Sequence, residues 1–171
     1  GPSNNSFVIS NSQDNGIYLI NSPDNIIGGN STSERNIISA NQSSGIFISG
    51  ASATGNEIKG NYIGIDKNGT SYILNSSQQT GIYFTISSAM LNTIGGSAAN
   101  EGNVISVNAY QGIYMRNNGA WGNTFSGNII GPQANGTSYV ASNAQLYGMY
   151  ITSSQNNYIG GSTVFQRNII S

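Results

Sequence analysis

The chain has 171 residues and a net charge of −1, and only 6% of its residues are charged. It lacks a basic run that could neutralise a series of phosphates, so we expect no nucleic acid partner. It also lacks an apolar run of the ~18 residues needed to cross a bilayer, and it contains no histidine or cysteine. These properties argue against membrane insertion, disulfides and thiolate chemistry.

Both ends of the chain indicate a piece of a larger protein. Gly1-Pro2-Ser3 resembles the remnant left when a protease removes a purification tag, and the last residues, RNIIS, stop inside a repeat. We expect residues 1–4 to be a tag remnant or disordered start. Residues 5–171 are then expected to form a single domain, a fragment of a longer solenoid.

One repeated unit runs through the whole sequence. It opens on a Gly-apolar-x-apolar segment: GIYL at 16, GIFI at 45, GIYF at 81, GIYM at 112 and GMYI at 148. Two Asn-x-apolar segments follow each copy. Three short β-like segments per unit predict an all-β fold, a single-stranded parallel β-helix of about five coils with three strands per coil. The spacing does not follow the hexapeptide beat of left-handed β-helices, which favours a right-handed solenoid.

Two columns of asparagine lead the second and third segments. The first column is Asn25, Asn56, Asn92, Asn123 and Asn157, and the second is Asn36, Asn61, Asn103, Asn128 and Asn168. Each Asn lies two residues before an inward apolar side chain, so it also faces inward. Stacked about 4.8 Å apart, these amides can form hydrogen-bonded ladders. Asn also tolerates the left-handed backbone expected at bends. We interpret both columns as structural.

An aromatic column occupies the middle position of the first segment. Its members are Tyr18, Phe47, Tyr83, Tyr114 and Tyr150. Alternation along a strand turns these rings outward and the flanking apolar residues inward. Aromatic rings on a flat sheet suit sugars or a partner protein's apolar surface, which makes the column a candidate binding site. Alternatively, the stacked rings only stabilise the sheet.

The third segment carries an outward column that is too apolar to leave bare. It consists of Ile37, Tyr62, Val104, Ile129 and Ile169. Two insertions, at 66–80 and 131–147, leave the repeat on the same side two coils apart, and such loops often form the binding face of a solenoid. The sequence leaves two alternatives for how this apolar column is buried. The insertions fold over it, or neighbouring chains bury it in a homo-oligomer such as a trimer.

No catalytic constellation, metal site or cofactor is predicted. Glu34 and Glu101 occupy equivalent positions two coils apart, about 10 Å, near the upper limit for an inverting glycosidase. Both lie in polar segments with no source of a raised pKa, and Gln166 follows in the column, so we interpret them as surface charges. Asp14 and Asp24 lack the dense pattern of calcium-binding β-rolls. Outward threonines are too sporadic for ice binding.

The segments GIYM, NTIGG, GNVIS and GNYIG resemble the Asn-rich repeats of pectate-lyase-like right-handed parallel β-helices, above all those of large secreted or surface-anchored bacterial proteins. That superfamily includes lyases, hydrolases, epimerases, tailspikes, adhesins and passive stalks, so the resemblance implies an extracellular location. We expect a non-enzymatic scaffold or adhesin segment that binds a glycan or a cell-surface protein. The alternatives are a fragment of a polysaccharide lyase, hydrolase or epimerase, a trimeric fibre or tailspike, and a mechanical spacer.

Overall fold

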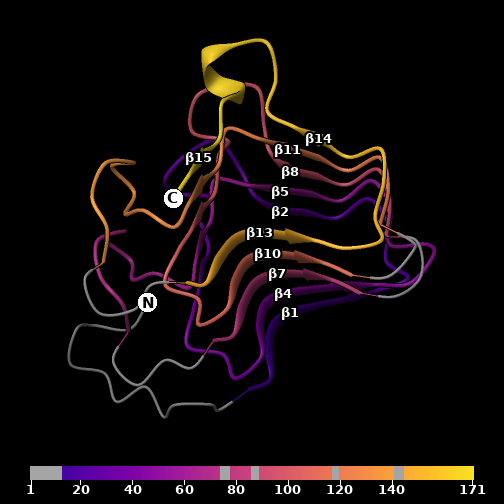
Figure 1. Cartoon of the computed structure of the whole chain (residues 1–171), viewed down its shortest axis with the longest axis horizontal. Helices are drawn as coiled ribbons and strands as arrows, with labels where there is room; N and C mark the ends of the chain where they lie inside the picture. The colour runs from indigo at the N-terminus through magenta and orange to yellow at the C-terminus, as the bar shows by residue number, and fades with distance from the viewer. Residues whose placement is uncertain (1–12, 74–77, 86–88, 117–119, 141–144) are drawn as a thin grey trace.

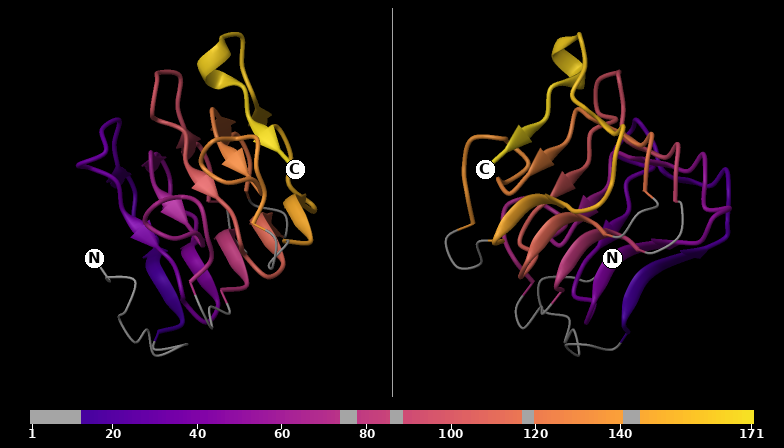
Figure 2. Two further views of the ribbon diagram at one scale, coloured as in Figure 1. Left: turned by 90° about the vertical axis from the view of Figure 1, so that its left-hand side faces the viewer. Right: turned by 45° about the vertical axis from the view of Figure 1, so that its right-hand side comes forward.

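The computed structural model describes residues 13–73, 78–85, 89–116, 120–140 and 145–171. They form three parallel sheets of five strands each, coiled about one axis (Figures 1 and 2). The predicted right-handed parallel β-helix of about five coils, with three short strands per coil, is confirmed. The expected tag remnant at 1–4 and parts of both insertions, at 74–77 and 141–144, lie outside the described residues.

Each coil contributes one strand to each sheet. The first sheet contains β1 (Asn15–Ile20), β4 (Ser44–Ser49), β7 (Thr80–Phe84), β10 (Gln111–Met115) and β13 (Tyr147–Ile151). The second sheet contains β2 (Ile26–Gly28), β5 (Glu57–Lys59), β8 (Thr93–Gly95), β11 (Thr124–Ser126) and β14 (Tyr158–Ile159). The third sheet contains β3 (Ile37–Ile38), β6 (Tyr62–Ile63), β9 (Val104–Ile105), β12 (Ile129–Ile130) and β15 (Ile169–Ile170). A short 3-10 helix, η1 (Val164–Gln166), precedes β15.

Equivalent residues pair directly across neighbouring strands, so the interior is a set of aligned stacks. Ile46 pairs with Ile82, and Ile82 with Ile113, and all three side chains are fully buried. In the second and third sheets Ile58 pairs with Ile94, and Ile63 with Ile105. Each fully buried isoleucine contributes roughly 1.5–3 kcal/mol by removal of apolar surface from water. The hydrophobic core is therefore one continuous column along the solenoid axis.

The ten predicted asparagines form two continuous ladders of hydrogen bonds. Asn56 donates from its backbone N–H and from Nδ2 to Oδ1 of Asn92, both at 2.9 Å. Asn92 repeats the pattern toward Asn123, and its Nδ2 also donates to the Ala53 carbonyl at 3.0 Å. In the second ladder Asn61 donates likewise to Asn103. The stacking satisfies buried amides that would otherwise destabilise the fold.

The expected left-handed backbone lies one position away from the first ladder. None of the ladder asparagines has a positive φ, so that part of the prediction is wrong. The preceding residue has it on every coil: Asp24 (57°), Gly55 (68°), Leu91 (58°), Gly122 (68°) and Asn156 (56°). The ladder position therefore requires the amide group itself, and the backbone reversal is supplied by its neighbour.

A third ladder, not anticipated from the sequence, lines the bend before the first sheet. Gln13 donates to Asn41 at 2.7 Å, Asn41 to Gln78 at 2.7 Å, Gln78 to Asn108 at 2.8 Å, and Asn108 to Gln145 at 3.4 Å. Each Gln stands three residues before the glycine of its coil and each Asn stands four. Glutamine has one more methylene group than asparagine, so its amide reaches the same ladder from a position one residue closer to the glycine.

Long and tight connections alternate from coil to coil. On coils one, three and five a long turn joins the second and third sheets, at 29–36, 96–103 and 160–168; Figure 2 shows these turns standing out from the body. On coils two and four that connection is only Gly60-Asn61 or Gly127-Asn128. The insertions after β6 and β12 fall on those same coils. The structural repeat is thus two coils long, which explains why Asn25 and Asn92 are 67 residues apart.

Candidate functional site

The aromatic column stands on the outer face of the first sheet. Neighbouring ring centroids are 4.7 Å (Tyr18–Phe47), 5.3 Å (Phe47–Tyr83), 4.9 Å (Tyr83–Tyr114) and 5.3 Å (Tyr114–Tyr150) apart. These separations follow from the pairing of equivalent residues on adjacent strands. Tyr18 is 56% exposed and Tyr150 40%, whereas the three rings between them are half-buried.

Ring orientation decides what this column offers to a ligand. Tyr83 and Tyr114 stack with an interplanar angle of 6°, so each covers one face of the other. Such pairs contribute about 0.5–1.5 kcal/mol beyond the burial of area, so the column also supports the sheet. In its middle, a ligand meets ring edges and hydroxyl groups instead of open ring faces.

Arg116 adds a positive charge to the aromatic column. It follows Tyr114 by two residues and so projects from the same side of the sheet. A hydrogen bond with the Tyr83 hydroxyl, with a smaller contribution from Tyr114, raises the pKa of Arg116 above its ordinary value. Strand alternation could have identified this residue from sequence, because positions two apart share a face. Tyr147 extends the column laterally, with its ring 5.2 Å from that of Tyr150.

The apolar column of the third sheet is partly covered by the insertions. Val104 is buried in a small cluster with Ile65 and Val107, and Ala134 and Val140 of the second insertion pack against it. The two insertions also contact each other, since the Ala134 N–H donates to the Gly69 carbonyl at 2.8 Å. The insertions therefore cover part of this apolar column, which is one of the two alternatives that the sequence left open.

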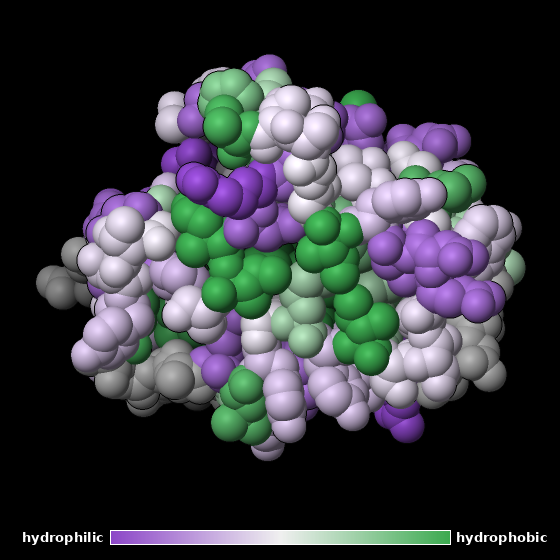
Figure 3. Space-filling view, turned by 45° about the horizontal axis from the view of Figure 1, so that its top comes forward, coloured by the Kyte–Doolittle hydropathy of each residue, from purple (hydrophilic) through white to green (hydrophobic). Residues whose placement is uncertain are grey.

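A groove of about 350 Å³ lies across the outer face of the third sheet. Its floor includes Tyr62, Val104 and Ile129, and the long turns at 96–103 and 160–168 border it. Arg35 and Arg167 line it as well. Figure 3 looks onto the side from which the long turns project and shows hydrophobic residues gathered beside strongly hydrophilic ones. The apolar column on its floor was predicted from the sequence, whereas the groove itself was not.

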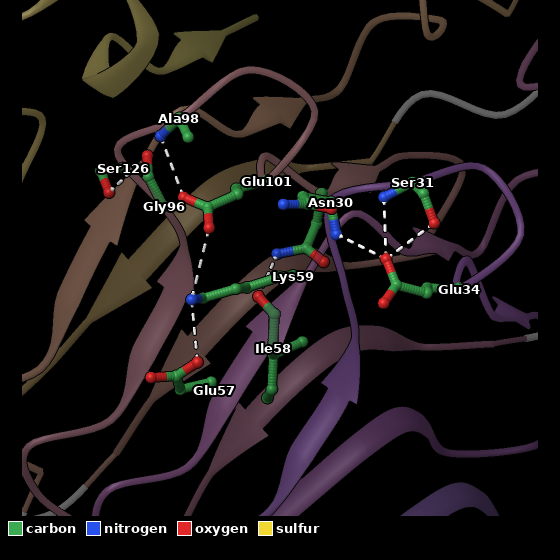
Figure 4. A network of polar contacts seen from close by, with 11 residues as sticks. Asn30, Ser31, Glu34, Glu57, Ile58, Lys59, Gly96, Ala98, Glu101 and Ser126 are labelled. Carbon is green, nitrogen blue, oxygen red and sulfur yellow. Dashed lines mark hydrogen bonds and ion pairs between the residues drawn. The ribbon is translucent and has the colours of Figure 1, made fainter.

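Glu34 and Glu101 each close the turn to which they belong. Oε2 of Glu34 accepts hydrogen bonds from the backbone N–H groups of Asn30 (3.1 Å) and Ser31 (3.0 Å) and from the Ser31 hydroxyl (2.7 Å; Figure 4). Oε2 of Glu101 accepts from the Ala98 N–H at 2.9 Å. The amide oxygen of Gln166 fills the same place, accepting from two N–H groups of its own turn.

These hydrogen bonds do not fit an acid catalyst. The hydrogen bonds from Ser31 hold the pKa of Glu34 below its ordinary value, and the Ala98 N–H does the same for Glu101. A proton donor needs the opposite shift. Because Gln166 performs the same task without a charge, the shared role of this column is to shape the long turns.

Glu57, Lys59 and Glu101 form a small ion-pair network on the outer face of the second sheet (Figure 4). Lys59 Nζ lies 2.8 Å from Glu57 Oε2 and 3.5 Å from Glu101 Oε1. The hydrogen bond with Glu57 raises the pKa of Lys59. Both strand residues point away from the buried Ile58, because side chains alternate between the two faces of a strand. Among the described residues no three His, Cys, Asp or Glu side chains gather to hold a metal, and Asp14 and Asp24 join no such group.

Within the described part of the chain, no helix is long and apolar enough to span a bilayer. Comparison with known protein families, with curated proteins and with solved structures gave no match.

Proposed function

We propose that this chain is a non-enzymatic, extracellular β-helix segment, a scaffold or adhesin that binds a glycan along the outer face of its first sheet. The observation that carries the proposal is the unbroken column of five aromatic side chains, paired in register from β1 to β13. Four of the five are tyrosines, and three of them, Tyr83, Tyr114 and Tyr150, stand on successive strands.

A linear polysaccharide fits this surface better than an irregular partner does. It presents hydroxyl groups at a regular repeat, and a chain lying parallel to the solenoid axis can exchange hydrogen bonds with successive tyrosines. The column beside the aromatics, two positions further along each strand, adds Ser49, Thr85, Arg116 and Thr152. The lowered pKa of both Glu34 and Glu101 favours a binding role over hydrolysis.

Binding to a glycan array tests the proposal. Replacing both Tyr83 and Tyr114 with Ala removes the stack and the hydroxyls, and binding should fall to background. Replacing both with Phe keeps the stack, so affinity should fall by roughly 2–10-fold for each lost hydrogen bond. Tyr139→Ala, in the second insertion and 77% exposed, is the matched control. Failure of the native chain to bind any glycan, or undiminished binding by the double Ala variant, would overturn the proposal.

A further inference from the structure

The groove on the third sheet has an unbalanced charge. Two of the five cationic side chains of the protein, Arg35 and Arg167, line it, and none of the six acidic side chains does. The nearest acids in the sequence, Glu34 and Glu101, turn their carboxylates to their own turns or to Lys59. The groove therefore attracts negative charge that the chain itself does not supply.

Two contacts orient the guanidinium group of Arg35. Its guanidinium carbon lies 4.2 Å from the centroid of the Tyr62 ring, and its Nε donates to the Gly60 carbonyl at 3.0 Å. These two contacts fix the plane of the guanidinium without using its terminal nitrogens. A planar fork oriented in this way suits a carboxylate, which can accept two parallel hydrogen bonds.

Arg167 occupies the position equivalent to Arg35 four coils further along. Each precedes an asparagine of the second ladder, and the three intervening members of this column are Gly60, Gly102 and Gly127. No side chain therefore rises between the two arginines from this column. Four strand spacings place their Cα atoms about 19 Å apart.

Between the arginines the groove presents both apolar side chains and polar groups. Val104, Ile129 and Ile169 line the groove, and Phe165 of η1, 52% exposed, stands at its border. Aliphatic and aromatic side chains of a peptide can bury against these groups.

We propose that this groove binds an extended acidic peptide segment of another protein, with one carboxylate at Arg35, another at Arg167 and apolar side chains between them. An extended chain advances about 3.3 Å per residue, so a spacing of about six residues between the two carboxylates matches the separation of the Arg35 and Arg167 Cα atoms. This site is separate from the aromatic column and does not depend on the proposed glycan binding.

The test is fluorescence anisotropy with labelled peptides of about twelve residues that carry two Glu separated by three, six or nine positions, with Val and Leu between. The spacing of six should bind best. Arg35→Gln and Arg167→Gln should each weaken binding by about 10–100-fold, as expected for a lost charge-assisted hydrogen bond. Arg116→Gln removes the same charge from a different face and is the control.

Three results would overturn the proposal: no peptide binds, affinity is independent of carboxylate spacing, or Arg116→Gln weakens binding as much as Arg167→Gln. Tighter binding of an oligouronate with the same number of carboxylates would assign the groove to glycans, and dimers or trimers lost on Phe165→Ala would assign it to a second copy. If Arg35→Gln does not fold, Arg167→Gln decides alone, because Arg167 is exposed. Replacement of Tyr83 and Tyr114 should leave peptide affinity unchanged.

Discussion

At the scale of single residues, each bend before the second sheet divides two tasks between neighbouring positions. The residue before the ladder takes the left-handed backbone conformation, and the asparagine after it passes hydrogen bonds to the next coil. Glycine fills the first position on coils two and four, whereas Leu91 fills it on coil three with φ at 58°. A leucine there has a Cβ close to its own carbonyl oxygen, which destabilises the conformation.

Leu91→Gly should therefore stabilise the protein. Relief of the left-handed strain outweighs the greater freedom of glycine in the unfolded chain, and we expect a gain of about 0.5–1 kcal/mol in the free energy of unfolding. Leu146 is also exposed but has no positive φ, so Leu146→Gly should destabilise by a similar amount. Urea unfolding measures both changes. Equal destabilisation by the two substitutions would contradict the assignment of strain to Leu91.

A broken ladder should destabilise the middle of the solenoid more than its end. Asn92→Ala leaves two donors of the buried Asn56 and the carbonyl of Ala53 without their partner. Oδ1 of Asn123 loses one of two donors and keeps the backbone N–H of residue 92. We expect a loss of about 2–4 kcal/mol. Asn157→Ala removes the same side chain from the last described rung, which is half-buried, and should have less than half that effect. Similar losses at both positions would show that the ladder does not act through buried amides.

At the scale of the elements, the long turns depend on an oxygen acceptor more than on a charge. Glu34, Glu101 and Gln166 each accept backbone N–H bonds within their own turn. The two carboxylates make this contact sensitive to acid, while the amide does not titrate. Turn shape should therefore persist when one type replaces the other.

Glu101→Gln should flatten the dependence of stability on pH. The pKa of Glu101 in the folded state lies below its ordinary value of 4.5, so its contribution is complete above that pH and disappears as the pH falls through the lowered pKa. Thermal unfolding between neutral pH and pH 3 should show a smaller loss of Tm for the variant. Gln166→Glu is the reciprocal test and should introduce such a loss. An unchanged acid slope in both variants would refute this role.

Sequence alone could predict what repeats in every coil. The Ile stacks, the Asn columns and the outward aromatics recur at fixed positions, and a parallel coil places them in register. The third ladder was missed because Gln and Asn alternate at two different offsets, so no single column shows it. The groove was missed because it depends on the projection of the long turns and on the way Arg35 stacks on Tyr62. Such contacts join residues that follow no repeat.

At the scale of the whole molecule, the alternation of connections makes two coils the unit of stability. Insertions on coils two and four contact each other across the intervening coil, through the Ala134 to Gly69 hydrogen bond. The third ladder follows the same period, with Gln on odd coils and Asn on even ones. A deletion that places two odd coils or two even coils next to each other therefore disturbs both the contact between the insertions and the third ladder.

Deletion of two coils should therefore destabilise the protein less than deletion of one coil. Removal of residues 56–122 joins Gly55 to Asn123 and takes out two coils, so the alternation is kept and the third ladder continues as Gln13, Asn41, Gln145. Removal of residues 92–122 takes out one coil, sets Gln78 against Gln145 and crowds the insertions together. Because a solenoid is stabilised by its neighbour interfaces, the mismatched interface should lower the Tm below that of the shorter protein. A higher Tm for the single-coil deletion would show that each coil is an independent unit.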